Sequence, residues 1–450
     1  MSTHQFTTRT AIAIVVANMI GTGVFTSLGF QLVDIQSTFV LMMLWLVGGV
    51  TALCGALTYA ELGSSLPRSG GEYNFLSEIY HPAAGFISGW ISATVGFAAP
   101  TALAAMTFGA YLEASISGLS ATVMASLLVI TLTLVHAFSH AASGGVQSVF
   151  TVLKVLLIIL FVGLVAFSVE NPQPVTLLPA AGDGTLLISS AFAISLIYVN
   201  YAYTGWNAAT YIINEVEEPQ RSMPVILFTG TATVLVLYLL LNYTFLYAAP
   251  MAEMTGKIEI GVIVAQFAFG ETGGMIMGIV LATLLISTVS AMVIAGPRVL
   301  QVIGEDFTLF RLLSRKNANQ IPMIAIMTQS AVTLFFILTS TFESVLVFSG
   351  FVMGVNTFFA VAGVFLLRRR LAASELEETE KSSYRTSYRT WGYPVTPLIY
   401  LGLMAWTLIY ILINRPEEGW AGLGMIVAGG LLYLLSEKLG KAKAGDSGLG

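Results

Sequence analysis

The sequence is poor in charged residues and holds a single cysteine. Only 10% of its 450 residues are Asp, Glu, Lys or Arg and 56% are hydrophobic, whereas soluble domains carry about 25% charged residues. Most of the chain is therefore expected to lie in a lipid bilayer. Because Cys54 has no second cysteine in the chain, an internal disulfide, a zinc cluster and a cysteine redox pair are excluded.

Other signals are also missing. The net charge is only −5 and no block of basic residues occurs, so we expect no nucleic acid partner. The N-terminus, MSTHQFTTRT, lacks the features of a signal peptide and is expected to be mature sequence. His136 and His140 stand four residues apart without a third ligand, so we expect no metal, and no motif indicates a cofactor.

Twelve apolar stretches are long enough to cross a membrane, for which a helix needs about 20 residues. They lie at 10–32, 38–63, 82–112, 121–140, 146–168, 187–214, 224–248, 260–300, 322–341, 343–367, 394–413 and 419–437. The stretch 260–300 exceeds one straight span and is expected to continue into an interfacial segment. The pattern predicts an all-α integral membrane protein with a disordered C-terminal tail at 438–450.

The positive charges predict the orientation of these spans. Sixteen Lys and Arg residues fall on the side that holds both termini, while the opposite loops hold only Lys257 and Arg415. Cytoplasmic loops carry an excess of Lys and Arg. Both termini are therefore expected in the cytoplasm, with the protein in the cell (inner) membrane.

Two of the spans contain residues that interrupt a helix. The first span carries Gly21, Thr22 and Gly23 at its middle, and the sixth carries Thr204 and Gly205. Glycine costs about 1 kcal/mol in a helix interior relative to alanine, and a backbone group left unpaired in hydrocarbon costs several kcal/mol. We therefore expect both breaks to face protein, water or a ligand.

The matching positions of the breaks predict two inverted repeats, 10–168 (helices 1–5) and 187–367 (helices 6–10), followed by helices 11 and 12 at 394–437. Paired interruptions are typical of the binding site of a transporter. Helix N-termini there hold an anion and free carbonyls hold a cation, so a zwitterionic amino acid suits both. The alternative is that the glycines only allow close helix packing.

Several stretches resemble the amino acid–polyamine–organocation permeases, and within them the bacterial relatives of L-type amino acid transporters. These stretches are MIGTGVF (19–25), ALTYAELGSSLPRSGGEYNFL (57–76), YAYTGWN (201–207) and NEVEEPQRSMP (214–224). The resemblance implies the 5+5 inverted-repeat, leucine-transporter-like fold, with helices 1 and 6 unwound in the middle of the membrane.

The resemblance also implies roles for the residues of the two breaks. The substrate carboxylate would bind at Gly21, Thr22 and Gly23, and the α-amino group at the carbonyls of Met19, Ile20, Tyr201, Ala202 and Thr204, beside Gly205. Tyr201 would close over the substrate as an outer gate.

Lys154 is the only Lys or Arg well within a span. The resemblance implies that its ammonium lies against the carbonyls of unwound helix 1, where sodium-driven relatives bind a cation, so that sodium is not needed. Alternatively, its long stem reaches the membrane interface, or the buried amine carries protons.

Charged residues also cluster at the inner ends of helices 2 and 6. Glu61, Arg68, Glu215 and Arg221 are expected either to pair across the inner mouth and separate when it opens, or to be solvated loop residues.

The leading hypothesis is a sodium-independent secondary transporter of neutral L-amino acids, working by alternating access as an exchanger or a proton symporter. Alternatives are a polyamine or cationic amino acid permease and a non-transporting sensor. An enzyme is disfavoured because no span carries a set of His, Asp or Cys residues.

In animal L-type transporters a cysteine between helices 3 and 4 links a heavy chain. Residues 113–120 contain no cysteine, so we expect no disulfide-linked heavy chain.

Overall fold

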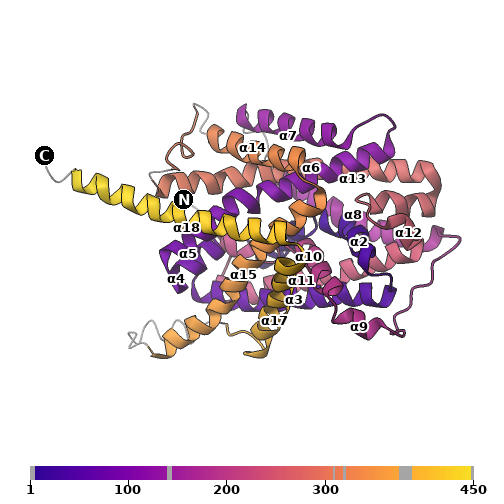
Figure 1. Ribbon diagram of the computed structural model, residues 1–450, viewed down its shortest axis with the longest axis horizontal. Helices are drawn as coiled ribbons and strands as arrows, with labels where there is room; N and C mark the ends of the chain where they lie inside the picture. Colours follow the sequence, from indigo (N-terminus) through magenta and orange to yellow (C-terminus); the bar gives the residue numbers. More distant parts are fainter. Residues whose placement is uncertain (1–5, 139–143, 308–309, 318–320, 374–387, 447–450) are drawn as a thin grey trace. The chain divides into compact units, whose positions relative to one another are not determined.

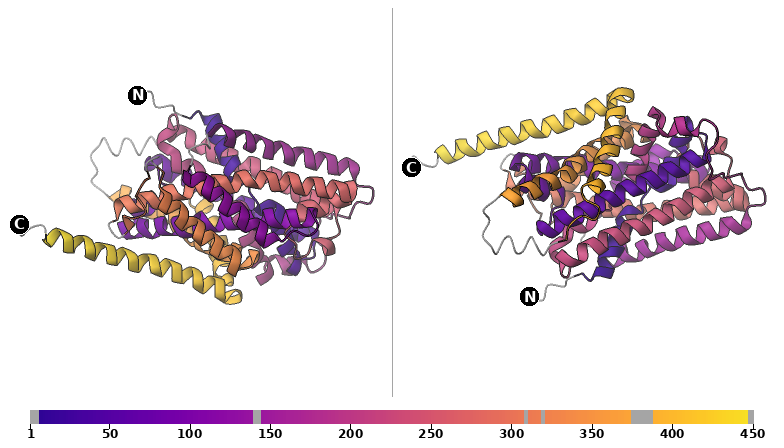
Figure 2. Two further views of the ribbon diagram at one scale, coloured as in Figure 1. Left: turned by 90° about the horizontal axis from the view of Figure 1, so that it is seen from above. Right: turned by 90° about the horizontal axis from the view of Figure 1, so that it is seen from below.

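The computed structural model describes residues 6–138, 144–307, 310–317, 321–373 and 388–446. Every regular element in these ranges is a helix (Figures 1 and 2), apart from an isolated bridge between Phe6 and Val216. Nine helices of the described chain are long and apolar enough to cross a membrane. Three shorter apolar helices coincide with further predicted spans: Val152–Ser168, Ser190–Ala202 and Met323–Thr339. The all-helical membrane class is thus confirmed.

The helices form two compact units. Unit 1 comprises Met1–Gly85, Val155–Ile260 and Gly354–Arg415, and unit 2 comprises Phe86–Lys154, Gly261–Met353 and Pro416–Gly450. Each unit draws on both predicted repeats, so the units are not the repeats themselves, and the repeat boundaries stay a prediction. Four helices begin in one unit and end in the other: α5 (Pro82–Ile91), α8 (Gly144–Ser168), α13 (Ile260–Asp306) and α15 (Phe342–Ala373).

Unit 1 is built on α3 (Thr38–Ser65) and α11 (Pro219–Ala248), which lie side by side (Figure 1). Its other helices are α1 (Thr8–Met19), α2 (Gly23–Asp34), α4 (Glu72–Ile79), α9 (Asp183–Leu187), α10 (Ser190–Ala202), the 3₁₀ helix η2 (Ala208–Glu215), α12 (Met251–Met254) and α17 (Val395–Asn414).

Glycines on α3 let its neighbours approach closely. A Cβ on Gly48 would lie 2.3 Å from Val199 Cγ1 of α10, and one on Gly49 would lie 2.2 Å from Leu235 Cδ1 of α11. Small residues at such crossings are how helices pack in membranes, where no hydrophobic force drives them together. Unit 1 therefore holds α10 and α11 directly against α3.

Unit 2 contains α6 (Ala98–Ser115), α7 (Ala121–Phe138) and α14 (Met323–Thr339), which pack on one another, together with the π-helix η1 (Ser92–Gly96), α18 (Pro416–Asp446) and nearly all of α13. The overlong eighth stretch is divided at Gly270, whose φ of +74° interrupts α13.

The last helix is longer than expected. α18 continues to Asp446, past residue 437 where the sequence predicts the final span to end. Residues 438–446 contain three Lys and two Ala, which favour a helix, together with two Gly. Residues 447–450 of the predicted tail lie outside the described chain.

Candidate functional site

The first span breaks where its glycines predict. α1 ends at Met19 and α2 begins at Gly23, with Ile20, Gly21 and Thr22 outside both helices. Thr22 precedes α2 without a side-chain cap, and no hydrogen bond of the described residues uses the N–H of Thr22 or Gly23. The N–H of Gly21 donates instead to the Met19 carbonyl at 2.9 Å. Two of the three amides predicted to hold a carboxylate are therefore free at a helix N-terminus, where an anion is favoured.

The sixth span is interrupted as well. α10 ends at Ala202, residues 203–207 form a turn, and η2 continues the chain from Ala208. Gly205 has a φ of +106°, in the left-handed region that side chains disfavour. The N–H of Thr204 donates to the Tyr201 carbonyl at 3.0 Å.

The two breaks lie directly against each other. A Cβ on Gly23 would lie 2.6 Å from Ala202 Cα, and one on Gly205 would lie 2.7 Å from the carbonyl carbon and oxygen of Asn18. Each glycine thus faces the backbone of the other interrupted span. Unit 1 brings the predicted carboxylate and ammonium positions into a single site.

Tyr238 of α11 connects the two breaks. Its hydroxyl donates to the Met19 carbonyl at 2.6 Å and is within donating distance, 3.1 Å, of the Ala202 carbonyl. The backbone N–H of Gly21 faces the same hydroxyl oxygen. The side chain is completely buried. The phenol therefore fixes the carbonyls at the ends of α1 and α10, to which the family resemblance gives the role of binding the substrate amino group.

Removing this hydroxyl is expected to weaken substrate binding. Tyr238→Phe leaves two buried carbonyls without their shared donor, at a cost of about 1–2 kcal/mol, which corresponds to about a 5- to 30-fold higher KM. The KM of amino acid uptake into proteoliposomes measures the effect. Tyr243→Phe, at a more exposed tyrosine of the same helix that stacks on Tyr247, is the matched control. An unchanged KM in Tyr238→Phe would show that the phenol does not order the site.

Tyr201, the predicted gate, contacts the first break. Its side chain is 9% exposed and forms a hydrogen bond with the side chain of Thr22. Two residues of the predicted site, one from each interrupted span, are therefore in contact.

Lys154 has a protein partner in unit 2. Its ammonium donates to Thr288 Oγ1 of α13 at 2.7 Å. The hydroxyl gives the charge a fixed acceptor inside the protein. The predicted approach of Lys154 to the carbonyls of helix 1 stays a prediction.

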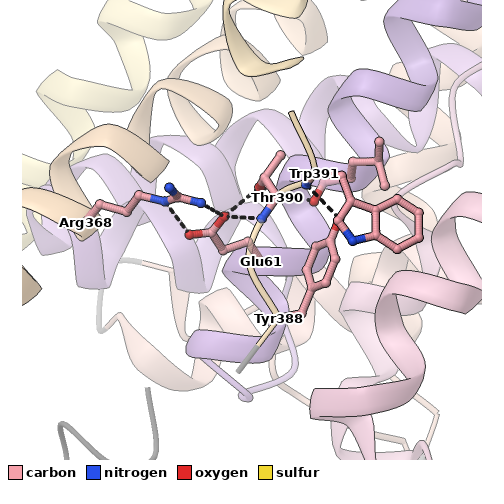
Figure 3. A network of polar contacts seen from close by, with 6 residues as sticks. Glu61, Arg368, Tyr388, Thr390 and Trp391 are labelled. Carbon is pink, nitrogen blue, oxygen red and sulfur yellow. Dashed lines mark hydrogen bonds and ion pairs between the residues drawn. The ribbon is translucent and has the colours of Figure 1, made fainter. Parts of the chain in front are cut away.

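Ion pairs at the inner ends of the spans involve two of the four predicted charges, Glu61 and Arg221. Glu61, completely buried in α3, accepts two hydrogen bonds of 2.7 Å from the guanidinium of Arg368 (Figure 3). Arg221 pairs at 3.5 Å with Glu218, three residues away, and both side chains are exposed. The prediction pairs the inner ends of helices 2 and 6 with each other, whereas the partner of Glu61, Arg368, follows it by 307 residues and lies in α15.

The segment before α17 completes the Glu61 network (Figure 3). The N–H and the hydroxyl of Thr390 donate to Glu61 Oε2 at 2.7 and 2.6 Å. The Arg368 guanidinium lies 3.6 Å above the centre of the Tyr393 ring. Burial raises the pKa of the Tyr388 phenol, and the nearby Glu61 carboxylate raises it further. The neutral phenol accepts the N–H of Trp391 at 3.2 Å.

The histidines predicted not to bind metal are only partly described. His136 Nε2 lies 2.8 Å from Ser290 Oγ, and His140 lies outside the described residues. Among the described residues, no group of three His, Cys, Asp or Glu could hold a metal ion.

Known proteins resemble this chain over most of its length. Residues 6–434 match the family model described as amino acid permease. The rat large neutral amino acids transporter small subunit 2 is 26% identical over 441 residues, covering 94% of this chain and 79% of the relative. The human b(0,+)-type amino acid transporter 1 is 24% identical over 437 residues, covering 94% and 85%. The human cystine/glutamate transporter is 24% identical over 366 residues, covering 79% and 72%.

These matches extend over almost the whole chain, far beyond the motifs of the two breaks. Together with the long apolar helices, they identify a multi-pass membrane protein that is a transporter rather than an enzyme. The chain belongs to the amino acid permease family.

Proposed function

We propose that the protein is a sodium-independent secondary transporter of neutral L-amino acids that works by alternating access. The observation that carries the proposal is the direct contact between the two interrupted spans at Gly23 and Gly205. This contact brings the free amides of Thr22 and Gly23 close to the ordered carbonyls of Met19 and Ala202. Together these groups suit the carboxylate and ammonium of a zwitterion. The name of the rat relative, a large neutral amino acids transporter subunit, supports the same substrate class.

The substrate carboxylate binds the amides of Thr22 and Gly23 at the start of α2, with Gly21 beside them. The α-amino group binds the carbonyls of Met19 and Ile20 and those of Tyr201, Ala202 and Thr204. Tyr201 closes over the bound substrate. Support comes from the free amides of α2 and from the Tyr238 hydroxyl that orders two of the carbonyls.

The fold that accompanies this function has twelve spans, with spans 1–5 and 6–10 as inverted repeats. Interruptions in the first and sixth spans support it, because these are corresponding positions of the two repeats. The excess of Lys and Arg on one side supports cytoplasmic termini in the inner membrane.

Lys154 takes the place of a coupling cation. Its fixed ammonium on Thr288 supports this role over simple extension to the membrane interface. Transport is then either amino acid exchange or proton symport. Glu61, Arg68, Glu215 and Arg221 belong to the inner gate, in which the Glu61–Arg368 pair is the contact that breaks.

The expectation of a chain without a disulfide-linked heavy chain has no support from the comparisons, because the rat relative is named a small subunit. The expectation rests instead on the burial of the single cysteine. Cys54, 8% exposed within α3, is the only cysteine. A disulfide with another chain requires an accessible thiol.

Uptake by purified protein in proteoliposomes tests the proposal. Radiolabelled alanine, serine, leucine and arginine are offered with and without internal amino acid, under separate sodium and proton gradients. We expect uptake of the neutral amino acids that ignores sodium. Dependence on internal amino acid identifies exchange, and uptake driven by a proton gradient into empty vesicles identifies symport. Preference for arginine would indicate a cationic amino acid permease, and binding without flux a sensor.

A further inference from the structure

Three cations lie close together in unit 2, on the segment that follows α13. The side chains of Arg311, Arg315 and Lys316 are all exposed. Neither of the two ion pairs found in the described chain involves any of them. Glu305, near the end of α13, accepts instead the side-chain amide of Gln301 at 2.6 Å. The three positive charges are therefore available to a ligand.

Aromatic side chains anchor this segment to the rest of unit 2. The centre of the Phe307 ring lies 4.5 Å from that of Phe86, and the Phe310 ring lies 6.1 Å from that of Trp90, both on α5. The Phe86 ring is also 5.6 Å from the Tyr433 ring of α18. Aromatic pairs at these distances attract each other beyond the apolar area that they bury. The segment is therefore packed against two other helices of unit 2.

The backbone of the segment is also held against α13. A Cβ on Gly304 would lie 2.6 Å from the backbone nitrogen of Ser314 and 2.7 Å from the Phe310 carbonyl oxygen. The N–H of Leu313 donates to the Phe310 carbonyl at 2.8 Å, and the Ser314 hydroxyl donates to the Arg311 carbonyl at 2.9 Å. Because the backbone is already ordered, a ligand that binds the cations has less conformational entropy to remove.

An exposed leucine stands among the cations. Leu312 is 53% exposed, whereas the next residue, Leu313, packs against buried residues of unit 2. The apolar stretch of α13 that is long enough to cross a membrane ends at Glu305, and α14 begins at Met323. The segment therefore lies where the chain leaves one apolar helix and enters the next, which is the level of the lipid headgroups.

We propose that Arg311, Arg315 and Lys316 form a binding site for an anionic phospholipid, with Leu312 against its acyl chains. The guanidinium groups donate hydrogen bonds to the phosphate oxygens of the headgroup, and the ammonium adds a third positive charge. An anionic headgroup on hydrocarbon chains complements both the cations and the leucine. The site belongs to unit 2, whereas the interrupted spans belong to unit 1, so the inference does not depend on the proposed function.

Binding of radiolabelled phosphatidylglycerol to the purified protein in dodecyl maltoside micelles tests the site, with zwitterionic phosphatidylcholine as the comparison. We expect wild type to bind phosphatidylglycerol at least about tenfold more tightly. Each Lys or Arg near an anionic lipid contributes about fivefold in affinity. The triple variant Arg311→Gln, Arg315→Gln and Lys316→Gln should therefore bind phosphatidylglycerol about 10- to 100-fold more weakly. Equal affinities of wild type for the two lipids would overturn the proposal.

A second triple variant removes the same charge from other places. Arg9, Arg369 and Lys438 are exposed cations that are far apart in the sequence. Arg9→Gln, Arg369→Gln and Lys438→Gln together should leave the affinity for phosphatidylglycerol within about twofold of wild type. Both triple variants change only exposed side chains and should melt close to wild type. Equal losses of affinity in the two variants would indicate only a general attraction between opposite charges and would overturn the site.

Leu312→Gln distinguishes a lipid from a free anion. The variant keeps all three cations and should weaken phosphatidylglycerol binding severalfold, because the acyl chains lose an apolar contact. Inorganic phosphate at about 10 mM should displace little of the bound lipid from wild type, since it offers no acyl chain. Full displacement by phosphate, together with unchanged lipid affinity in Leu312→Gln, would identify a site for free anions and refute the lipid site.

Discussion

Arg368→Ala is expected to lower the free energy of unfolding by about 3–5 kcal/mol, because it removes the guanidinium from a buried carboxylate. Glu61 is completely buried, and the Arg368 side chain is 20% exposed. The pair makes two parallel hydrogen bonds, the strongest geometry for an arginine and a carboxylate. The variant also loses the contact with the Tyr393 ring. Thermal unfolding of the purified protein in detergent measures the loss.

A neighbouring arginine provides the control for this prediction. Arg369 is exposed, and Arg369→Ala should leave the melting temperature close to that of wild type. Replacing both members, as Glu61→Gln with Arg368→Met, is expected to recover part of the loss, since no unpaired charge is left buried. Equal melting temperatures for Arg368→Ala and Arg369→Ala would show that the pair contributes nothing measurable.

The interruptions of the spans could be predicted because their signal is local. Glycine at Gly21, Gly23 and Gly205 disfavours a helix wherever the fold places it. The direct contact of the breaks is not local, because it depends on Gly205 meeting Asn18 from a distant part of the chain. The sequence indicates a shared site through the matching positions of the two interruptions and through the family resemblance.

The polar partners of buried charges could not be predicted in the same way. Glu61 stands near Arg68 in the sequence, yet its partner Arg368 comes from the end of α15. Tyr238 carries no signal that separates it from other tyrosines of a membrane helix, until α11 is known to cross both breaks. Glu72 belongs in the sequence to the charges at the inner ends of helices 2 and 6, and its burial depends on η2 folding over it.

Gly205→Ala and Gly23→Leu are expected to lower substrate affinity by about 100-fold or more, equivalent to roughly 3 kcal/mol. The Cβ that alanine adds at position 205 would lie 2.7 Å from the Asn18 carbonyl. The backbone there has a φ of +106°. Such a conformation costs about 1–3 kcal/mol for a residue other than glycine, before any clash. A leucine at Gly23 meets the backbone of Ala202 at 2.6 Å. Equilibrium binding of radiolabelled substrate to the purified variants measures the loss.

The variant Gly21→Ala distinguishes a role of the glycines in substrate binding from a role in close helix packing. A Cβ at Gly21 meets only the Met19 carbonyl, at 4.0 Å, and its φ is not positive, so the variant should fold as stably as wild type. The methyl is added one residue before the free amides of Thr22 and Gly23, where it should reduce substrate affinity severalfold. Gly163→Ala, in α8 with no atom within 4 Å of the new Cβ, should leave affinity unchanged and raise stability by about 1 kcal/mol at most. If the glycines served packing alone, Gly21→Ala would bind substrate like wild type, and the affinities of the other variants would follow their stability. Lower affinity at unchanged stability therefore identifies the break as the place where the substrate carboxylate binds.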